Sequence, residues 1–143
     1  MIKTEFEYKK AVEKVREERQ RIEAEQTRLR KAGVADALLN LAIDPLASFT
    51  MQLEEEIHFY ENIKQGVFPE LHNLAGIGRL LIALRISKDI QQKELAKKLG
   101  VAEAQISRDE RNEYHGASIE KIRSVLEALE GTLISGIETR VRA

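Results

Sequence analysis

Near its start the chain is highly charged and free of helix breakers, and apolar residues return every three or four positions from Thr4 to about Lys31. The positions of this stripe are Tyr8, Val12, Val15, Arg19, Ile22, Gln26 and Leu29. The spacing predicts one long helix with a single apolar side. Because two of the steps are polar, packing against another helix of the same chain is the favoured interpretation, and an intersubunit coiled coil is the alternative.

Two further helices are predicted before residue 68. Gly33 is suited to end the first helix, and a short apolar helix over Val34–Ile43 follows it. Pro45 marks a new boundary, because proline is favoured at the start of a helix. A third helix then runs over Leu46–Gln65. We therefore expect residues 1–67 to form a helical region of two long helices joined by a short one, used for dimerisation or for binding a partner.

After Pro69 the apolar spacing indicates shorter helices. We expect them at about Glu70–Ser87, Gln92–Leu99, Ala102–Arg111 and Ser118–Glu130. The tail from Thr132 to Arg142 alternates Thr, Ile and Val loosely, which favours a short strand. An isolated strand needs a partner, such as the same strand of a second subunit. Residues 68–143 are thus expected to form a second domain with a C-terminal tail.

Composition supports an all-α protein, since only 8 Gly and 2 Pro interrupt the 143 residues. The absence of cysteine excludes disulfides and thiolate metal sites and suits a reducing cytoplasm. The first residues lack a signal peptide, and no stretch approaches the ~20 apolar residues of a membrane span. We expect a soluble cytoplasmic protein that does not contact a membrane.

Charge is distributed unevenly. The net charge is −1, but residues 1–75 hold 11 Lys and Arg against 14 Asp and Glu, whereas residues 76–143 hold 12 against 10. Such a mild asymmetry argues against nonspecific coating of nucleic acid. Any DNA binding must therefore depend on a local basic face.

The most informative segment is Gln92–Arg111, which reads QKELAKKLGVAEAQISRDER. A small residue at Ala96 lets a second helix approach the first, and Gly100 allows the tight turn that follows Leu99. Leu95, Leu99, Val101 and Ile106 supply the apolar contacts between the two helices. Together this spacing predicts a helix-turn-helix.

With these residues in place, residues 74–131 resemble the Cro/C1-type (XRE) helix-turn-helix family of bacterial and phage regulators. The resemblance implies a lambda-repressor-like, five-helix domain that binds double-stranded DNA. It implies a transcriptional regulator, by default a repressor that binds a palindromic operator as a homodimer through the N-terminal helices, the C-terminal tail or both. The segment around Asp109–Tyr114 is similar, more weakly, to HigA-like antitoxins. Alternatives are therefore an antitoxin that represses its own operon and neutralises a toxin protein, and an interaction module that has lost DNA binding.

The resemblance also implies roles for single residues. Arg85 corresponds to an arginine that pairs with a glutamate at the end of the recognition helix, here Glu110. Asp89 lies at a turn where the family usually has Gly, and Asp adopts positive φ more readily than most residues. The implied DNA-facing residues are Gln92, Lys93, Glu103, Ala104, Gln105, Ser107, Arg108 and Arg111. By their chemistry Arg108 suits guanine, Gln105 adenine and Glu103 cytosine. The side chains suited to phosphate are those of Lys93, Lys97, Lys98, Arg111 and Lys121.

Asp109 departs from the pattern, because the family usually has an apolar core residue there. This departure predicts that the helix ends early or is rotated, or that Asp109 forms a hydrogen bond near Tyr114 or His115. Glu103 departs in another way, since its charge repels phosphate. Both departures keep the loss of DNA binding open as an alternative.

Nothing in the sequence supports catalysis or a cofactor. The three histidines have no metal-ligand spacing, and neither a Ser, His and Asp arrangement nor any cysteine suggests a nucleophile. Gly76 and Gly78 lack the rest of a phosphate-binding loop and indicate a bend or a point of close packing. We therefore expect no enzyme, no metal site and no cofactor.

Overall fold

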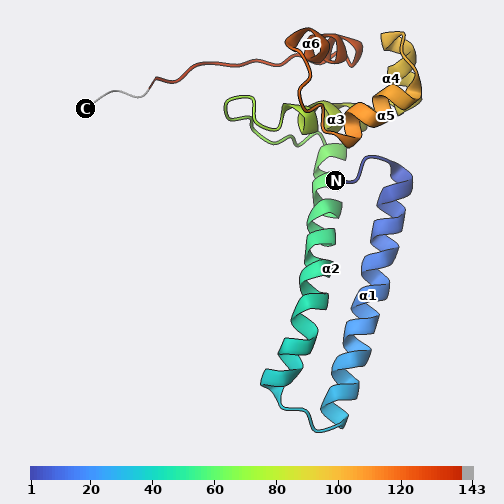
Figure 1. The fold of residues 1–143 in the computed structure, drawn as a ribbon, viewed down its shortest axis with the longest axis vertical. Helices are drawn as coiled ribbons and strands as arrows, with labels where there is room; N and C mark the ends of the chain where they lie inside the picture. The colour runs from blue at the N-terminus through green and yellow to red at the C-terminus, as the bar shows by residue number, and fades with distance from the viewer. Residues whose placement is uncertain (140–143) are drawn as a thin grey trace. The chain divides into compact units, whose positions relative to one another are not determined.

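The computed structural model describes residues 1–139, and this range contains six α-helices and no strand (Figure 1). The all-α class expected from the sequence is confirmed. Contacts divide the chain into a first unit, Met1–Phe68, and a second unit that begins at Pro69. Within the described residues, no helix is both long and apolar enough to cross a membrane.

The first unit is an antiparallel hairpin of α1 (Glu5–Lys31) and α2 (Asp36–Lys64), which lie side by side (Figure 1). Thr4 caps α1 by accepting a hydrogen bond from the backbone N–H of Glu7 at 3.1 Å, which satisfies one of the free donors of the first turn. Gly33, with φ of +77°, follows the end of α1, as its position in the sequence predicted.

The side of α1 that packs on α2 differs from the predicted stripe by one residue at two steps. Ala11 and Glu18 are buried, whereas Val12 and Arg19 are exposed. Arg19 instead reaches across to α2, where its Nε donates to Glu54 at 2.7 Å. The packing side therefore alternates steps of three and four residues, as the predicted stripe does, but it runs through Ala11 and Glu18 in place of Val12 and Arg19. The pairing is within the chain, as the favoured interpretation had it.

The prediction of a helix boundary at Pro45 was wrong, because Pro45 lies inside α2. Proline removes one backbone hydrogen bond from a helix interior, but here it lies on the exposed side, where water can solvate the carbonyl that is left free. Leu39 and Ile43 before it and Thr50 after it are buried. Burial against α1 on both sides of the proline thus outweighs the local preference for a break.

The second unit contains α3 (Ile77–Ser87), α4 (Gln92–Leu99), α5 (Glu103–Arg111) and α6 (Ile119–Ala128). These are four described helices, whereas the resemblance implied five. Helix α3 begins at Ile77 and not at the predicted Glu70. Asn73, Leu74 and Gly76 before it all have positive φ, which is incompatible with an α-helix. The most buried side chains of its core are Leu81, Ile82, Leu95, Ile106, Val125 and Leu129.

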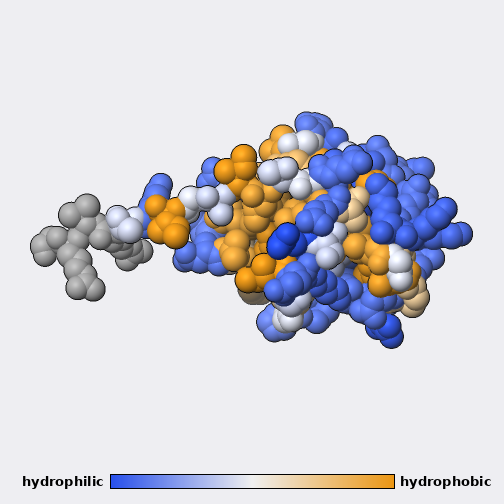
Figure 2. Space-filling model, turned by 90° about the horizontal axis from the view of Figure 1, so that it is seen from above, coloured by the Kyte–Doolittle hydropathy of each residue, from blue (hydrophilic) through white to orange (hydrophobic). Residues whose placement is uncertain are grey.

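The tail after α6 forms no strand over its described part, residues 132–139. The rest of the predicted strand, residues 140–142, lies outside the described residues. Ile134 and Ile137 are 88% and 93% exposed. Apolar side chains also gather on the surface next to the base of the tail (Figure 2). An extended segment becomes a stable β-strand only when a neighbouring strand forms backbone hydrogen bonds with it, and the described part of the tail has no such neighbour.

Gly78 is the point of close packing that the sequence indicated. It is buried in α3, and a Cβ added there would lie 1.7 Å from the carbonyl oxygen of Glu113. This carbonyl belongs to the backbone, which cannot move aside as the end of a flexible side chain can. Only glycine therefore allows the segment after α5 to lie against α3.

We predict that Gly78→Ala destabilises the second unit by about 3 kcal/mol or more, because the added methyl group must displace backbone. Gly136→Ala is the matched control, since a Cβ at that position meets nothing within 4 Å. Thermal unfolding followed by circular dichroism measures both variants. Equal midpoints for wild type and Gly78→Ala would show that the segment after α5 does not lie against Gly78.

Candidate nucleic-acid interface

The helix-turn-helix is formed by α4 and α5. Gly100 ends α4 with φ of +68°, a conformation that costs glycine little. The N–H of Val101 then donates to the carbonyl of Ala96 at 3.0 Å and closes the turn. Leu95, Ala96 and Ile106 are buried between the helices as predicted, while Val101 is 43% exposed.

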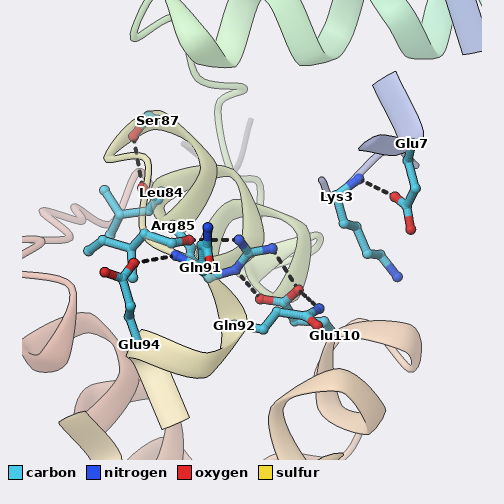
Figure 3. Close-up of polar contacts among 10 residues, drawn as sticks. Lys3, Glu7, Leu84, Arg85, Ser87, Gln91, Gln92, Glu94 and Glu110 are labelled. Carbon is cyan, nitrogen blue, oxygen red and sulfur yellow. Dashed lines mark hydrogen bonds and ion pairs between the residues drawn. The ribbon is translucent and has the colours of Figure 1, made fainter. Parts of the chain in front are cut away.

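A buried ion pair joins α5 to α3. Arg85 and Glu110 have side chains that are 4% and 0% exposed. Arg85 donates from Nε to Glu110 Oε1 at 2.5 Å and from Nη2 to Oε2 at 2.8 Å (Figure 3). This two-point geometry suits a planar guanidinium and a carboxylate. The structure thus brings together the two residues that the resemblance paired.

Gln92, at the start of α4, extends the pair to a third helix. Its Nε2 donates to Glu110 Oε2 at 2.7 Å (Figure 3). Arg85 Nη1 also donates to the carbonyl of Ile90 at 2.8 Å, in the turn that leads to α4. The amide of Gln92, for which the sequence suggested a phosphate contact, therefore also belongs to the internal network that orients α4.

The network sets the rotation of α5. With Ile106 and Glu110 directed inward, the opposite side of the helix faces solvent. Glu103, Ala104, Arg108 and Arg111 are exposed on α5, and Gln105 and Ser107 are half-buried at the borders of this side. Lys93 on α4 is exposed as well. We call the exposed side of α5 the outer face; it comprises Ala104, Ser107, Arg108 and Arg111.

The other basic residues differ in the polar contacts that their side chains already make within the protein. Lys97 is exposed. Lys98 Nζ donates to the carbonyl of Ala128 at 3.2 Å, and Lys121 Nζ lies 2.7 Å from Asp109 Oδ2. Of these three side chains, that of Lys97 has the fewest contacts to exchange for a phosphate.

Asp109 neither ends α5 early nor bonds to the side chains of Tyr114 or His115. The helix continues to Arg111. The Asp109 carboxylate contacts Gln105 and Lys121 instead, and its backbone carbonyl accepts the N–H of Tyr114 at 2.7 Å. Sequence reasoning missed the partner Lys121 because it lies on the next helix, although a charge at an expected core position was a signal that a counter-charge must be close.

Tyr114 is buried behind this network. Burial raises the pKa of its hydroxyl far above the usual value, and the negative charges of Glu110 and Asp109 raise it further, against a smaller opposite effect of Arg85. The ring therefore stays neutral. Among the described residues, no three His, Cys, Asp or Glu side chains gather as a metal site would require.

Comparison with known families identifies the region that contains this face. Residues 81–134 match the helix-turn-helix family model and form a helix-turn-helix domain of the Cro/C1 (XRE) type. Searches of curated proteins and of solved structures find no match. The family binds DNA and is typically not enzymatic.

We predict that Glu110→Ala destabilises the second unit by about 3–5 kcal/mol, because it leaves the buried charge of Arg85 without its carboxylate. The double variant Arg85→Met/Glu110→Leu removes both charges and should recover most of that loss. Chemical denaturation measures both. A double variant that is as unstable as Glu110→Ala would show that packing volume, and not the unbalanced charge, dominates at this position.

Proposed function

Because residues 81–134 form a DNA-binding helix-turn-helix domain of the Cro/C1 type, we propose that this protein is a sequence-specific transcriptional regulator that reads DNA with the outer face of α5. The observation that carries the proposal is the outward position of Arg108 and Arg111 on a short helix whose opposite side is anchored in the core. A helix of this kind fits the major groove and presents donors to the base edges.

The balance of charge around the outer face supports DNA as the ligand. Two acidic residues of α5 are neutralised within the unit, Asp109 by Lys121 and Glu110 by Arg85. Glu94 of α4 accepts the N–H of Gln91 at 2.8 Å. Lys93, Lys97, Arg108 and Arg111 are exposed cations, opposed by the exposed carboxylates of Glu94 and Glu103. This local excess of positive charge favours phosphate even though the whole chain has a net charge of −1.

The regulator is proposed to act as a repressor. Two copies would place their α5 helices in successive major grooves, ~34 Å apart on a palindromic operator, and block polymerase. Lys93, Lys97 and the N–H groups at the start of α4 are suited to phosphate, and the side chains of the outer face to base edges.

An exposed apolar stripe on α2 supports a dimer of this kind. Leu38, Leu41 and Phe49 are 61%, 71% and 52% exposed. At about 100° per residue they form a second apolar side, about a third of a turn from the side that packs on α1. A helix with two apolar sides is typical of bundles with more than two helices. Two α2 helices that cross antiparallel near Pro45 would place Leu41 of one copy opposite Phe49 of the other.

An antitoxin remains the second candidate. In that case the same stripe would hold a toxin protein in place of a second copy of this chain. The two candidates share the DNA-binding domain and differ in what covers α2.

We predict that the wild-type protein enriches a palindromic sequence from a random DNA pool and that its affinity falls steeply with salt, as counterion release requires. Arg108→Ala should lose roughly 5- to 150-fold in preference at one base position of each half-site, because a bidentate contact contributes about 1–3 kcal/mol. The enriched sequences and titrations at several salt concentrations measure both effects. If wild type enriches no sequence, the proposal is wrong.

We also predict that the protein is a dimer and that Leu41→Glu makes it monomeric, because a charge in the apolar stripe would be buried without a partner. Analytical ultracentrifugation measures the mass. Ile119→Glu is the control, since Ile119 is also highly exposed, at 69%, but lies on α6. A dimer that survives Leu41→Glu and dissociates with Ile119→Glu would assign the contact to the second unit instead.

A further inference from the structure

A chain of polar contacts runs from the surface of α5 to α6. Arg108 Nη2 donates to Gln105 Oε1 at 2.9 Å, and Gln105 Nε2 donates to Asp109 Oδ1 at 3.0 Å. The other oxygen of Asp109 lies 2.7 Å from Lys121 Nζ. Arg108 is exposed, Gln105 is half-buried, and the Asp109 side chain is only 14% exposed. This series of contacts is thus fixed at Asp109 and Lys121, and it ends at Arg108, whose side chain is accessible to solvent.

The chemistry of the two neighbours allows only one orientation of the Gln105 amide. Arginine can only donate hydrogen bonds, and an ionised carboxylate can only accept them. The amide oxygen must therefore face Arg108, and the amide nitrogen must face Asp109. Because an amide that reads adenine needs both its oxygen and its nitrogen for the base, Gln105 in this arrangement is not free to read adenine.

Arg108, by contrast, keeps most of its donors for DNA. It has five N–H groups in a rigid fork, and one nitrogen, Nη2, is engaged by Gln105. Guanine offers two acceptors on its major-groove edge, O6 and N7, and matches such a fork. Because Gln105 restrains the guanidinium before DNA is bound, less conformational entropy is lost on binding.

An isolated contact between Gln105 and Arg108 would have little effect, as is usual at an exposed surface. Asp109 makes the difference. Its carboxylate is mostly buried, which costs free energy that an apolar side chain would not, and Lys121 of α6 pairs with the oxygen that does not face Gln105. The Asp109 carboxylate therefore has little freedom to move, and its hydrogen bond restrains the Gln105 amide.

We propose that Arg108 reads a guanine in each half-site and that Asp109, acting through Gln105, is the positioning residue that sets the direction of the Arg108 guanidinium. This inference rests on the proposed function, since it specifies which base the outer face of α5 recognises and which residues fix that preference. Gln105 supports a guanine reader rather than reading adenine itself.

The test is selection from a random DNA pool with wild type, Arg108→Ala, Gln105→Ala, Asp109→Leu and Asp109→Asn. Arg108→Ala identifies the guanine that Arg108 contacts. Asp109→Leu keeps the volume but removes the acceptor, and preference for that guanine should fall roughly tenfold, equivalent to about 1.4 kcal/mol. Asp109→Asn has one oxygen for two donors, Gln105 Nε2 and Lys121 Nζ, so its preference for that guanine should lie between those of wild type and Asp109→Leu.

A purely structural role for Asp109 predicts a different pattern. In the positioning role, Asp109→Leu changes one base position and leaves the other positions, the binding to nonspecific DNA and its salt dependence unchanged, because phosphate contacts carry no sequence information. A loss spread equally over all positions, together with a lower unfolding temperature, overturns the inference.

The remaining outcomes separate the inference from the proposed function. Failure of the wild type to enrich any sequence overturns both. Enrichment by wild type, with the same guanine preference in Asp109→Leu, overturns the positioning role and leaves the regulator intact. Enrichment of adenine at the position that Gln105→Ala relaxes overturns the assignment of Gln105.

Discussion

The second unit depends on how the charge of Glu110 is satisfied. Its carboxylate is fully buried, and an unpaired charge there would cost several kcal/mol. The donors come from α3 and from the start of α4: two from Arg85 and one from Gln92. Only one placement of α5 brings both carboxylate oxygens to these donors, so the pair fixes the arrangement of three helices more than it adds to stability.

The rotation of α5 follows from this constraint, and the chemistry of the exposed side follows from the rotation. Once Ile106 and Glu110 point inward, Arg108 and Arg111 must point outward. Asp109 falls at the border, close enough to α6 for Lys121 to reach it. Two of the three carboxylates of α5, those of Asp109 and Glu110, are thus paired with cations of α6 and α3. For this reason the exposed side of α5 is suited to DNA although the helix has three acidic residues.

The first unit is built on different interactions. Its two long helices are held by apolar contacts and by polar links such as Tyr8 to Glu61, at 2.8 Å, and a stacked pair of tyrosine rings, Tyr8 and Tyr60. The uncovered apolar stripe of α2 distinguishes it from a hairpin that is complete by itself. A helix-turn-helix unit of a DNA-binding type and a unit with an uncovered apolar side are the two features on which the proposed dimeric regulator is based.

The sequence by itself determined the features that neighbouring residues encode: the helical class and the helix-turn-helix around Ala96 and Gly100. It narrowed Gly76 and Gly78 to a bend or a point of close packing, and the structure assigned close packing to Gly78. Tertiary structure decided the rest. Pro45 stays inside a helix because burial on α1 outweighs a local preference for a break, and packing against α2 buries Ala11 and Glu18 of α1 rather than Val12 and Arg19. The orientation of Gln105 depends on Lys121 through Asp109. A residue on another helix leaves no periodic signal in one sequence, so only the packed structure places these groups together.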